Sequence, residues 1–304
     1  MAQPLSIAAR LMHIILRLTG LKRMFMDDAR LQHQIDMVRQ RQIHPYVLPK
    51  IRWSCRVDEA HIAGIHVITL TPLDSAPRHT LVYFHGGAYL FEPSQGHWQM
   101  LDEMVVQSKV RIVVPIYPRV PQYIVDDAVP ALIDVLRHIQ TQYGAVILAG
   151  DSAGGGLAVS LANEMRAQQM PPAQALILMS PWLDVTMDNP EIPQYEAGDL
   201  VISAPGLKAL GQMWAGNRDP HDAWVSPLFA DLTGMPPITM IVGGVELFVP
   251  DCRRFRDKAL NAGVLVEYRE FDGCMHAFML LPTPEGRAAR KMVSDQLTKY
   301  KENA

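Results

Sequence analysis

The chain has 304 residues, of which 49% are hydrophobic and 19% are charged, and this balance excludes the disordered and fibrous classes of protein. The formal net charge at pH 7 is −3, so no basic excess exists to neutralise phosphates and nucleic acid is excluded as the main partner. At about 150 residues per domain, the length predicts two domains or one large α/β domain with an insertion.

The three cysteines, Cys55, Cys252 and Cys274, lie far apart and match no metal-binding spacing. We interpret them as reduced thiols, which predicts a cytoplasmic protein with no metal site.

The N-terminal segment from Leu5 to Leu18 is apolar, but Arg10, His13 and Arg17 interrupt it. We expect neither a signal peptide, which needs an unbroken apolar core, nor an integral membrane span, which needs about 18 consecutive apolar residues. The spacing predicts an amphipathic helix whose apolar face packs on the body of the protein. A membrane-surface role is the alternative, because basic residues lie nearby; they are Arg10, Arg17, Lys22 and Arg23.

Residues 1–50 have apolar positions three to four residues apart, which predicts a helical segment ending at Pro45 and Pro49. Two β-rich stretches follow, Ile51–Val57 and Ile62–Leu70, and we expect them to form an antiparallel pair.

From Thr80 onward, short apolar runs alternate with helical patterns. Most runs are continuous, as expected of strands covered on both faces. The predicted strands are Thr80–Phe84, Arg111–Ile116, Ala145–Ala149, Ala175–Met179, Ile238–Val242 and Val264–Phe271. The predicted helices lie between Ile116 and Gly144, at Ala153–Gln168, at Asp251–Ala262 and from Thr283 to about Lys301. This alternation predicts a mostly parallel sheet with helices on both faces.

Residues 183–235 interrupt the alternation by far more than a normal loop. They contain many prolines and a helix-like stretch around Ala204–Ala215. We interpret them as an insertion that caps one end of the sheet.

The segment Gly150-Asp151-Ser152-Ala153-Gly154 fits the pattern G-x-S-x-G and lies between a predicted strand and a predicted helix. In this context a serine stands above the sheet edge on a tight, strained turn. Glycines at both ends of the motif prevent clashes, and the helix N-terminus favours developing negative charge. We therefore predict that Ser152 is a nucleophile; a glycine-rich turn without chemistry is the alternative.

The segment His85-Gly86-Gly87-Ala88 directly follows the predicted strand Thr80–Phe84. Glycines let backbone N–H groups approach a ligand closely, which suits an oxyanion hole for a tetrahedral intermediate. We interpret His85 and Asp151 as structural residues. The predicted oxyanion donors are the N–H groups of Gly86, Gly87 and Ala153, with Ala88 as a further donor.

A serine nucleophile needs a base, and the base needs an orienting carboxylate. In this kind of site the chain order is serine, acid, histidine. Only His221 and His276 follow Ser152. Because His276 comes just after the last predicted strand and His221 lies in the insertion, we predict His276 as the base and His221 as a surface residue.

The acid is expected just after the predicted strand Ile238–Val242, and Glu246 lies in that turn. Asp251 is the alternative, although an acidic residue at that position also suits the start of a helix. We therefore predict Glu246 as the orienting acid.

Taken in order, these motifs resemble the hormone-sensitive-lipase-like branch of the α/β-hydrolases, which includes the bacterial family IV carboxylesterases. The resemblance spans roughly His79 to the C-terminus. It rests on residues 85–89, 150–155, 180–184, 226–228 and 236–246 and on the turn that contains His276.

The resemblance implies an α/β-hydrolase fold, with an eight-stranded, mostly parallel sheet and a helical cap. The cap would comprise residues 1–50 and the insertion at about 183–235, the latter within a catalytic domain over 51–304. The implied reaction is hydrolysis of short-chain, acetyl-like esters through an acyl-enzyme intermediate, without a cofactor. Two residues depart from the common family pattern: Ala88 replaces a third glycine, and Glu246 replaces the aspartate of many members.

Two other functions stay open. One is a non-catalytic ligand-binding protein on the same fold, and the other is an amidase or peptidase. The expected partner is a small-molecule ester, and the sequence leaves the oligomeric state open, a homodimer included.

Overall fold

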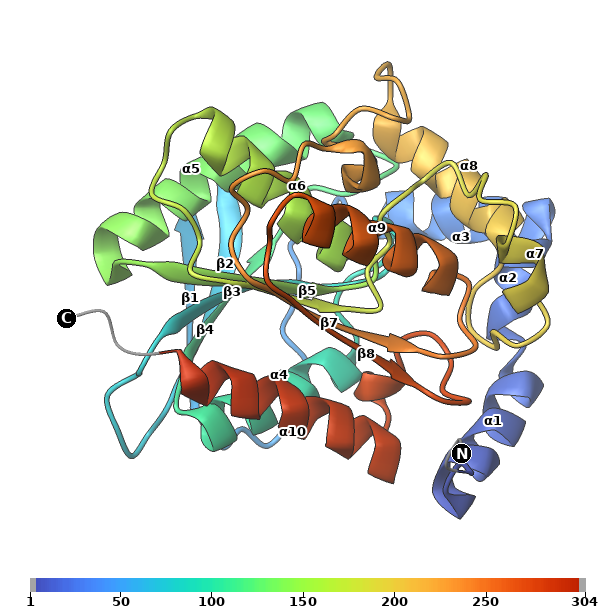
Figure 1. Ribbon diagram of the computed structural model, residues 1–304, viewed down its shortest axis with the longest axis horizontal. Coiled ribbons are helices and arrows are strands. Elements are labelled where there is room, and N and C mark those ends of the chain that lie inside the picture. Colours follow the sequence, from blue (N-terminus) through green and yellow to red (C-terminus); the bar gives the residue numbers. More distant parts are fainter. Residues whose placement is uncertain (1–3, 301–304) are drawn as a thin grey trace.

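An eight-stranded sheet lies at the centre of the protein, with helices on both faces (Figure 1). The computed structural model describes residues 4–300. The strand order is β1-β2-β4-β3-β5-β6-β7-β8. In chain order the strands are β1 (Arg56–Ile62), β2 (Ile65–Thr71), β3 (Thr80–Phe84), β4 (Arg111–Ile116), β5 (Val146–Asp151), β6 (Leu176–Met179), β7 (Ile238–Gly243) and β8 (Val266–Phe271).

The sheet is mostly parallel, as expected. Only β2 runs against its neighbours β1 and β4, and every pairing from β4 to β8 is parallel. The prediction that the first strand begins at Ile51 is wrong, because β1 begins at Arg56. Ile51 and Trp53 are partly buried side chains that pack on the core without joining the sheet, and Trp53 meets Trp98 edge-to-face.

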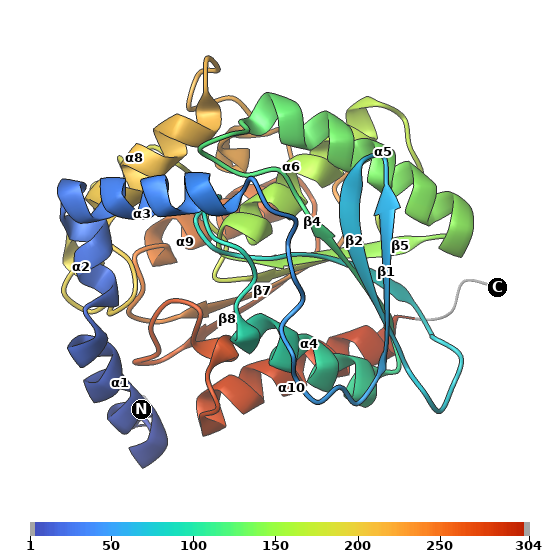
Figure 2. The same cartoon turned by 180° about the vertical axis from the view of Figure 1, so that it is seen from behind.

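Helices α5, α6 and α9 cover one face of the sheet, and α4 and α10 cover the other (Figures 1 and 2). The helices are α1 (Ile7–Thr19), α2 (Leu21–Met26), α3 (Asp28–Arg41), α4 (Gln95–Ser108), α5 (Val125–Tyr143), α6 (Ala153–Ala167), α7 (Ile192–Tyr195), α8 (Ala204–Ala215), α9 (Val249–Asn261) and α10 (Pro284–Lys299), with short 3₁₀ turns η1 (Pro227–Phe229) and η2 (Phe278–Leu280). The predicted end of the last helix, Lys301, lies outside the described residues.

Helix α4 is absent from the sequence-based prediction. Its signal is a capping box, in which the His97 side chain accepts a hydrogen bond from the Ser94 backbone. The helix buries residues on several sides, including Trp98, Leu101 and Asp102. Trp98, Leu101 and Val105 also recur at helical spacing, a second signal that the prediction from the sequence did not use.

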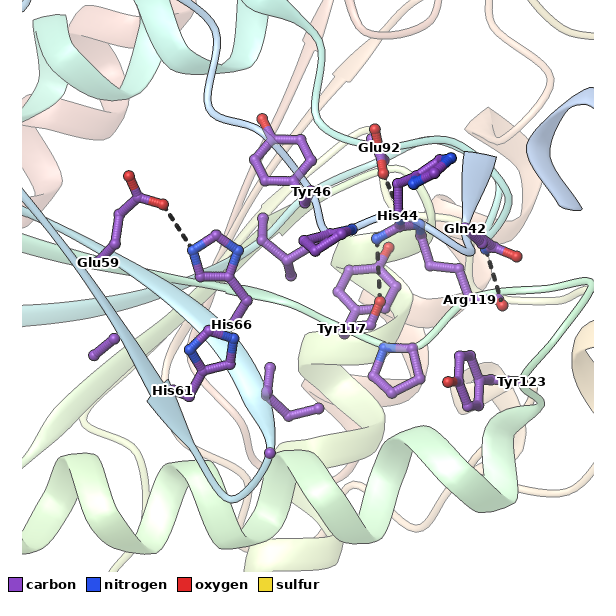
Figure 3. Close-up of a pocket in the computed structure, with 16 residues that line it drawn as sticks. Gln42, His44, Tyr46, Glu59, His61, His66, Glu92, Tyr117, Arg119 and Tyr123 are labelled. Atoms are coloured by element: carbon purple, nitrogen blue, oxygen red, sulfur yellow. Dashed lines mark hydrogen bonds and ion pairs between the residues drawn. The ribbon is translucent and has the colours of Figure 1, made fainter. Parts of the chain in front are cut away.

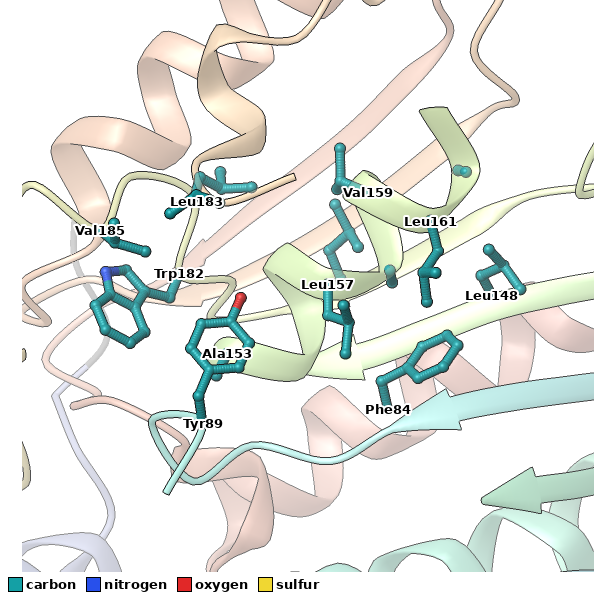
Figure 4. Packing of buried hydrophobic residues seen from close by; sticks show 14 of the residues in the cluster. Phe84, Tyr89, Leu148, Ala153, Leu157, Val159, Leu161, Trp182, Leu183 and Val185 are labelled. Atoms are coloured by element: carbon teal, nitrogen blue, oxygen red, sulfur yellow. The ribbon is translucent and has the colours of Figure 1, made fainter. Parts of the chain in front are cut away.

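The core has two parts, one on each face of the sheet. Alternate side chains of a strand point to opposite faces, so Phe84 lies in one cluster and Tyr83 in the other. Figure 4 shows Phe84 and Leu148 from the sheet facing Leu157 and Leu161 of α6. Burial on both faces explains why the strands read as continuous apolar runs.

A group of helices from two distant segments covers one end of the sheet. Helices α2 and α3 lie there beside α7 and α8 of the inserted segment, and α1 extends from α2 toward α10 (Figure 1). Gly206 of α8 approaches the backbone of Phe25 in α2. Lys22 Nζ donates to the carbonyl oxygen of Asp199 at 3.0 Å and forms an ion pair with Glu196 at 3.2 Å.

The predicted orientation of the N-terminal helix is wrong. In α1 only Ala9 is buried, whereas Ile7 and Leu18 are 83% and 82% exposed. The helix is held by its N-terminal end, where the Ser6 backbone and hydroxyl both donate to the Glu285 carboxylate. Within residues 4–300 no helix combines the length and the apolar character needed to cross a bilayer.

Close contact between α2 and α8 can be tested with Gly206→Ala. A Cβ at this position would lie 2.5 Å from the carbonyl oxygen of Phe25, so we expect the free energy of unfolding to fall by about 1–3 kcal/mol. Gly96→Ala is the matched control, because its Cβ would meet nothing closer than 3.5 Å. Denaturant unfolding of both variants gives the comparison. Equal stability of the two would contradict close packing of the cap helices.

Candidate active site

Ser152 occupies the tight turn between β5 and α6. Its backbone has φ 51° and ψ −123°, a left-handed conformation that non-glycine residues rarely adopt. Two glycines make the turn sterically feasible: a Cβ on Gly150 would clash with the Gly154 and Phe84 backbone, and a Cβ on Gly154 would clash with the Phe84 backbone. The motif glycines therefore let the turn sit against the end of β3.

His276 lies beside Ser152. The two residues are 124 positions apart, yet His276 Nε2 is 2.9 Å from Ser152 Oγ. The histidine follows β8 in a turn whose carbonyl at Cys274 accepts a hydrogen bond from Val245 N–H at 3.1 Å. The Phe248 ring meets the imidazole edge-to-face at 4.9 Å. The turns after β7 and β8 thus hold the imidazole in place.

Glu246 is fully buried on the far side of the imidazole. Its Oε1 lies 3.7 Å from His276 Nδ1, and neither atom has a hydrogen-bond partner within residues 4–300. This distance is longer than a hydrogen bond, and a shift of roughly 0.8 Å would close it. Its other oxygen accepts hydrogen bonds from Ser180 Oγ at 2.7 Å and from Gly243 N–H at 3.0 Å. The carboxylate is therefore anchored with one oxygen directed at the histidine.

Burial and nearby carboxylates, Glu246 foremost, act in opposite directions on the pKa of His276. Burial lowers the pKa of His276, but the neighbouring Glu246 carboxylate raises it, with smaller contributions from Asp199 and Asp151. The net result is a pKa above the ordinary histidine value. Such a histidine accepts a proton from the serine more readily than an unperturbed one.

The two alternative residues lie elsewhere. Asp251 is buried in the first turn of α9, where it accepts hydrogen bonds from Asn189 at 2.7 Å and from Arg254 at 3.2 Å. His221 is exposed and pairs with Asp219. The structure thus brings Ser152, His276 and Glu246 together and leaves Asp251 and His221 in other contacts.

The predicted oxyanion donors divide into two groups. Gly86 N–H donates to Asp151 Oδ1 at 2.7 Å, so the expectation that it donates to an oxyanion is wrong: the group is already occupied. The N–H groups of Gly87, Ala88 and Ala153 show no hydrogen bond to any part of the chain between residues 4 and 300. These three remain candidates.

Asp151 ties the glycine loop to the serine turn. Besides Gly86, its carboxylate accepts a hydrogen bond from Tyr83 OH at 2.5 Å and lies 3.2 Å from His97 Nε2. Burial raises the pKa of Asp151, but His97 and these donors outweigh it and lower the pKa to about 2. A permanently ionised, buried carboxylate therefore holds the loop after β3.

His85 shapes the same loop. The side chain is fully buried, its Nδ1 lies 2.7 Å from the Gly86 carbonyl oxygen, and its ring stacks on Tyr117 at 4.5 Å. Burial, aided by the charge of Arg119, holds its pKa well below the ordinary value. The imidazole is therefore neutral and structural, in agreement with the interpretation from the sequence.

Two supporting residues were missed by the sequence analysis. Ser180 belongs to a motif that carried the family resemblance, but only the structure shows its hydrogen bond to Glu246. Asp199 is fully buried in the inserted segment, and its Oδ2 accepts a hydrogen bond from Leu247 N–H at 3.2 Å. Burial raises the pKa of Asp199 to about 6, against the opposing effect of His276. No local pattern marks either contact, because both join distant segments.

One cavity, of about 720 Å³, is lined by Thr19–Leu21 and Met24 from the N-terminal helices and by Phe91 from the loop after β3. A second cavity, of about 510 Å³, is shown in Figure 3. It holds the ion pairs Glu59–His66 and Glu92–Arg119, and none of its lining residues is a predicted site residue. Within residues 4–300 no group of histidine, cysteine or acidic side chains is arranged to hold a metal ion.

Comparisons with known proteins concern the family and the fold. Residues 81–280 match the family described as alpha/beta hydrolase fold. An esterase of Acinetobacter venetianus is 29% identical over 251 residues, covering 81% of this chain and 82% of its own. An acetyl-hydrolase of Streptomyces hygroscopicus is 30% identical, covering 69% and 72%. A solved hormone-sensitive lipase from a metagenome library has a TM-score of 0.84 at 21% identity, covering 97% and 99%; this last likeness concerns the fold.

The anchoring role of Asp151 can be tested with Asp151→Ala. The substitution leaves the buried donors of Tyr83, Gly86 and His97 without an acceptor, so we expect the free energy of unfolding to fall by about 3–5 kcal/mol. Asp134→Ala is the control, because that residue forms an exposed ion pair with Arg137 and its loss costs at most about 0.5 kcal/mol. Urea unfolding measures both. A loss for Asp151→Ala as small as that of the control would refute the anchoring role.

Proposed function

We propose that this chain, which belongs to the α/β-hydrolase family and is a carboxylic ester hydrolase, uses Ser152, His276 and Glu246 to hydrolyse short-chain esters. The observation that carries the proposal is the 2.9 Å contact between Ser152 Oγ and His276 Nε2. A buried carboxylate behind the imidazole completes the arrangement expected of a serine hydrolase. Acetyl-hydrolase relatives support short acyl chains.

The reaction follows from the positions of the three side chains. Ser152 Oγ attacks the ester carbonyl carbon while His276 Nε2 takes the hydroxyl proton. Glu246 stabilises the imidazolium that forms and sets its tautomer. The proton then passes from His276 to the departing alcohol, which leaves an acyl group on Ser152. Water then attacks the acyl carbon while His276 takes one of its protons. The bond between the acyl carbon and Ser152 Oγ breaks, His276 returns the proton to Ser152 Oγ, and the acid leaves.

The negative oxygen of each tetrahedral intermediate is stabilised by backbone N–H groups. Those of Gly87, Ala88 and Ala153 are the donors, since Gly86 N–H is engaged by Asp151. The N-terminus of α6 adds its partial positive charge beside Ser152. One such donor contributes about 3–4 kcal/mol to stabilisation of the transition state.

A non-catalytic ligand-binding role does not explain why serine, histidine and acid meet in a buried cluster. An amidase or peptidase would use the same three side chains. The relatives reported above are an esterase and an acetyl-hydrolase, so ester hydrolysis is the function that we propose.

Replacement of the nucleophile tests this function. We expect Ser152→Ala to lower kcat for p-nitrophenyl acetate by about ten-thousandfold or more, because no other group can form the acyl-enzyme. Ser75→Ala, at an exposed loop position, is the control and should retain full activity. Circular dichroism establishes that both variants are folded. Substantial turnover by folded Ser152→Ala protein would disprove the assignment.

The pH dependence tests the acid. Only the neutral imidazole acts as a base, so kcat/KM falls as pH drops through the pKa of His276. Because Glu246 raises this pKa, we expect the midpoint of the acid limb to lie above the ordinary histidine value of about 6.5. Glu246→Gln removes the charge and should shift the midpoint to lower pH, as well as lowering kcat.

Asp251→Asn is the matched comparison, since Asp251 is held by Asn189 and Arg254. Its acid limb should stay where that of the unmodified protein lies. A shift in Asp251→Asn with none in Glu246→Gln would transfer the role of orienting acid to Asp251.

A further inference from the structure

Helix α1 presents its most apolar side to solvent. On this outward face, large side chains follow one another at helical spacing. We call these residues the apolar stripe; they are Ile7, Leu11, Ile14 and Leu18, with exposed fractions of 83%, 56%, 56% and 82%. Soluble globular surfaces normally scatter such residues singly. A continuous apolar stripe of this kind is typical of a surface that binds a membrane or another protein.

The inward face of α1 explains why the stripe cannot turn into the protein. Ala9 is buried against the body, and Met12 and Leu16 on the same side are partly buried. At the N-terminal end, Ser6 is bound to Glu285 by hydrogen bonds of 2.6 and 2.9 Å. The helix is thus attached through the face that carries Ala9, Met12 and Leu16, and it lies at the edge of the molecule (Figures 1 and 2).

The basic residues along α1 indicate that the apolar stripe faces an anionic lipid surface. Residues 7–26 contain four Arg or Lys residues and no acidic residue, although the whole chain has a formal net charge of −3. Lys22 is paired with Glu196, whereas Arg10, Arg17 and Arg23 are exposed. At 100° per residue, Arg10 and Arg17 lie roughly 80° from the centre of the apolar stripe, where lipid headgroups meet an interfacial helix.

We propose that α1 is an interfacial helix that binds the surface of an anionic lipid bilayer. The apolar stripe enters the boundary between headgroups and acyl chains, and Arg10 and Arg17 contact the anionic headgroups. A second copy of this chain fits the stripe less well. A symmetric pairing through this face would bring the arginines of both copies together without acidic partners on either helix.

Binding in this way would bring a cavity to the bilayer. Thr19, Gly20 and Leu21, at the junction of α1 and α2, line the cavity of about 720 Å³ that also includes Phe91. Phe91 belongs to the loop after β3 that carries Gly87 and Ala88. Membrane binding through α1 therefore places this cavity close to the lipid.

Vesicle co-sedimentation of the full chain tests the proposal. The probes are vesicles of phosphatidylcholine alone and of phosphatidylcholine mixed with phosphatidylglycerol. We expect binding to the mixed vesicles, at least tenfold weaker binding to phosphatidylcholine, and weakening of the former as salt is raised.

Two double variants separate the contributions. Leu11→Gln with Leu18→Gln should weaken binding to mixed vesicles by about tenfold or more. Arg10→Gln with Arg17→Gln should weaken it roughly 25-fold on mixed vesicles and leave binding to phosphatidylcholine unchanged. Leu73→Gln with Leu265→Gln is the matched control, because these two leucines are 71% and 74% exposed on other parts of the surface. This control should bind like the unmodified protein.

Hydrolysis of p-nitrophenyl acetate by all variants reports that the fold is intact, independently of lipid. The proposal is overturned if the unmodified protein does not bind mixed vesicles at low salt, or if the control loses as much binding as the stripe variant. Sedimentation velocity without lipid measures the oligomeric state of the protein and its variants. A dimer that dissociates in Leu11→Gln with Leu18→Gln would assign the stripe to a second copy and overturn the proposal.

Discussion

The hydrogen bond between Ser152 Oγ and His276 Nε2 is the contact on which the proposed site depends, because a serine hydroxyl is a weak nucleophile without a base. It joins the turn after β5 to the turn after β8, and these strands are separated in the sheet by β6 and β7. The contact therefore forms only when strands β5 to β8 are paired in the register that the sheet has. The left-handed backbone at Ser152 is the local cost of this geometry, and buried packing on both sides of the sheet offsets it.

Buried polar contacts keep the surrounding loops in place. Asp151 holds the loop after β3, and Ser180 with the Gly243 backbone holds one oxygen of Glu246. Each of these groups would be costly to leave unsatisfied in an interior of low dielectric constant. Within residues 4–300, Glu246 Oε1 and His276 Nδ1 are both buried without a hydrogen-bond partner, and these two atoms face each other. The unpaired carboxylate oxygen thus lies beside the nitrogen where positive charge would develop in the reaction that we propose.

Local patterns were sufficient to predict much of this protein, and long-range contacts account for what was missed. Ser152 could be proposed as the nucleophile because a strand, a tight turn and a helix follow one another within a few residues. His276 could be proposed as the base because serine, acid and histidine follow one another in this order along the chain of such hydrolases. The engagement of Gly86 by Asp151 could not be predicted, since it joins two loops 65 residues apart. The periodicity of α1 shows that an apolar face exists, but which side faces inward is decided by tertiary contacts such as Ser6 with Glu285.

The most direct test of the site is a crystal structure of the protein after reaction with diethyl p-nitrophenyl phosphate, whose phosphoryl group resembles the tetrahedral intermediate. We expect phosphorus bonded to Ser152 Oγ, with its phosphoryl oxygen within hydrogen-bond distance of the N–H groups of Gly87 and Ala153. The His276 imidazole should still face the adduct. An adduct on a different residue, or a phosphoryl oxygen directed away from both backbone segments, would contradict this assignment of nucleophile and oxyanion hole.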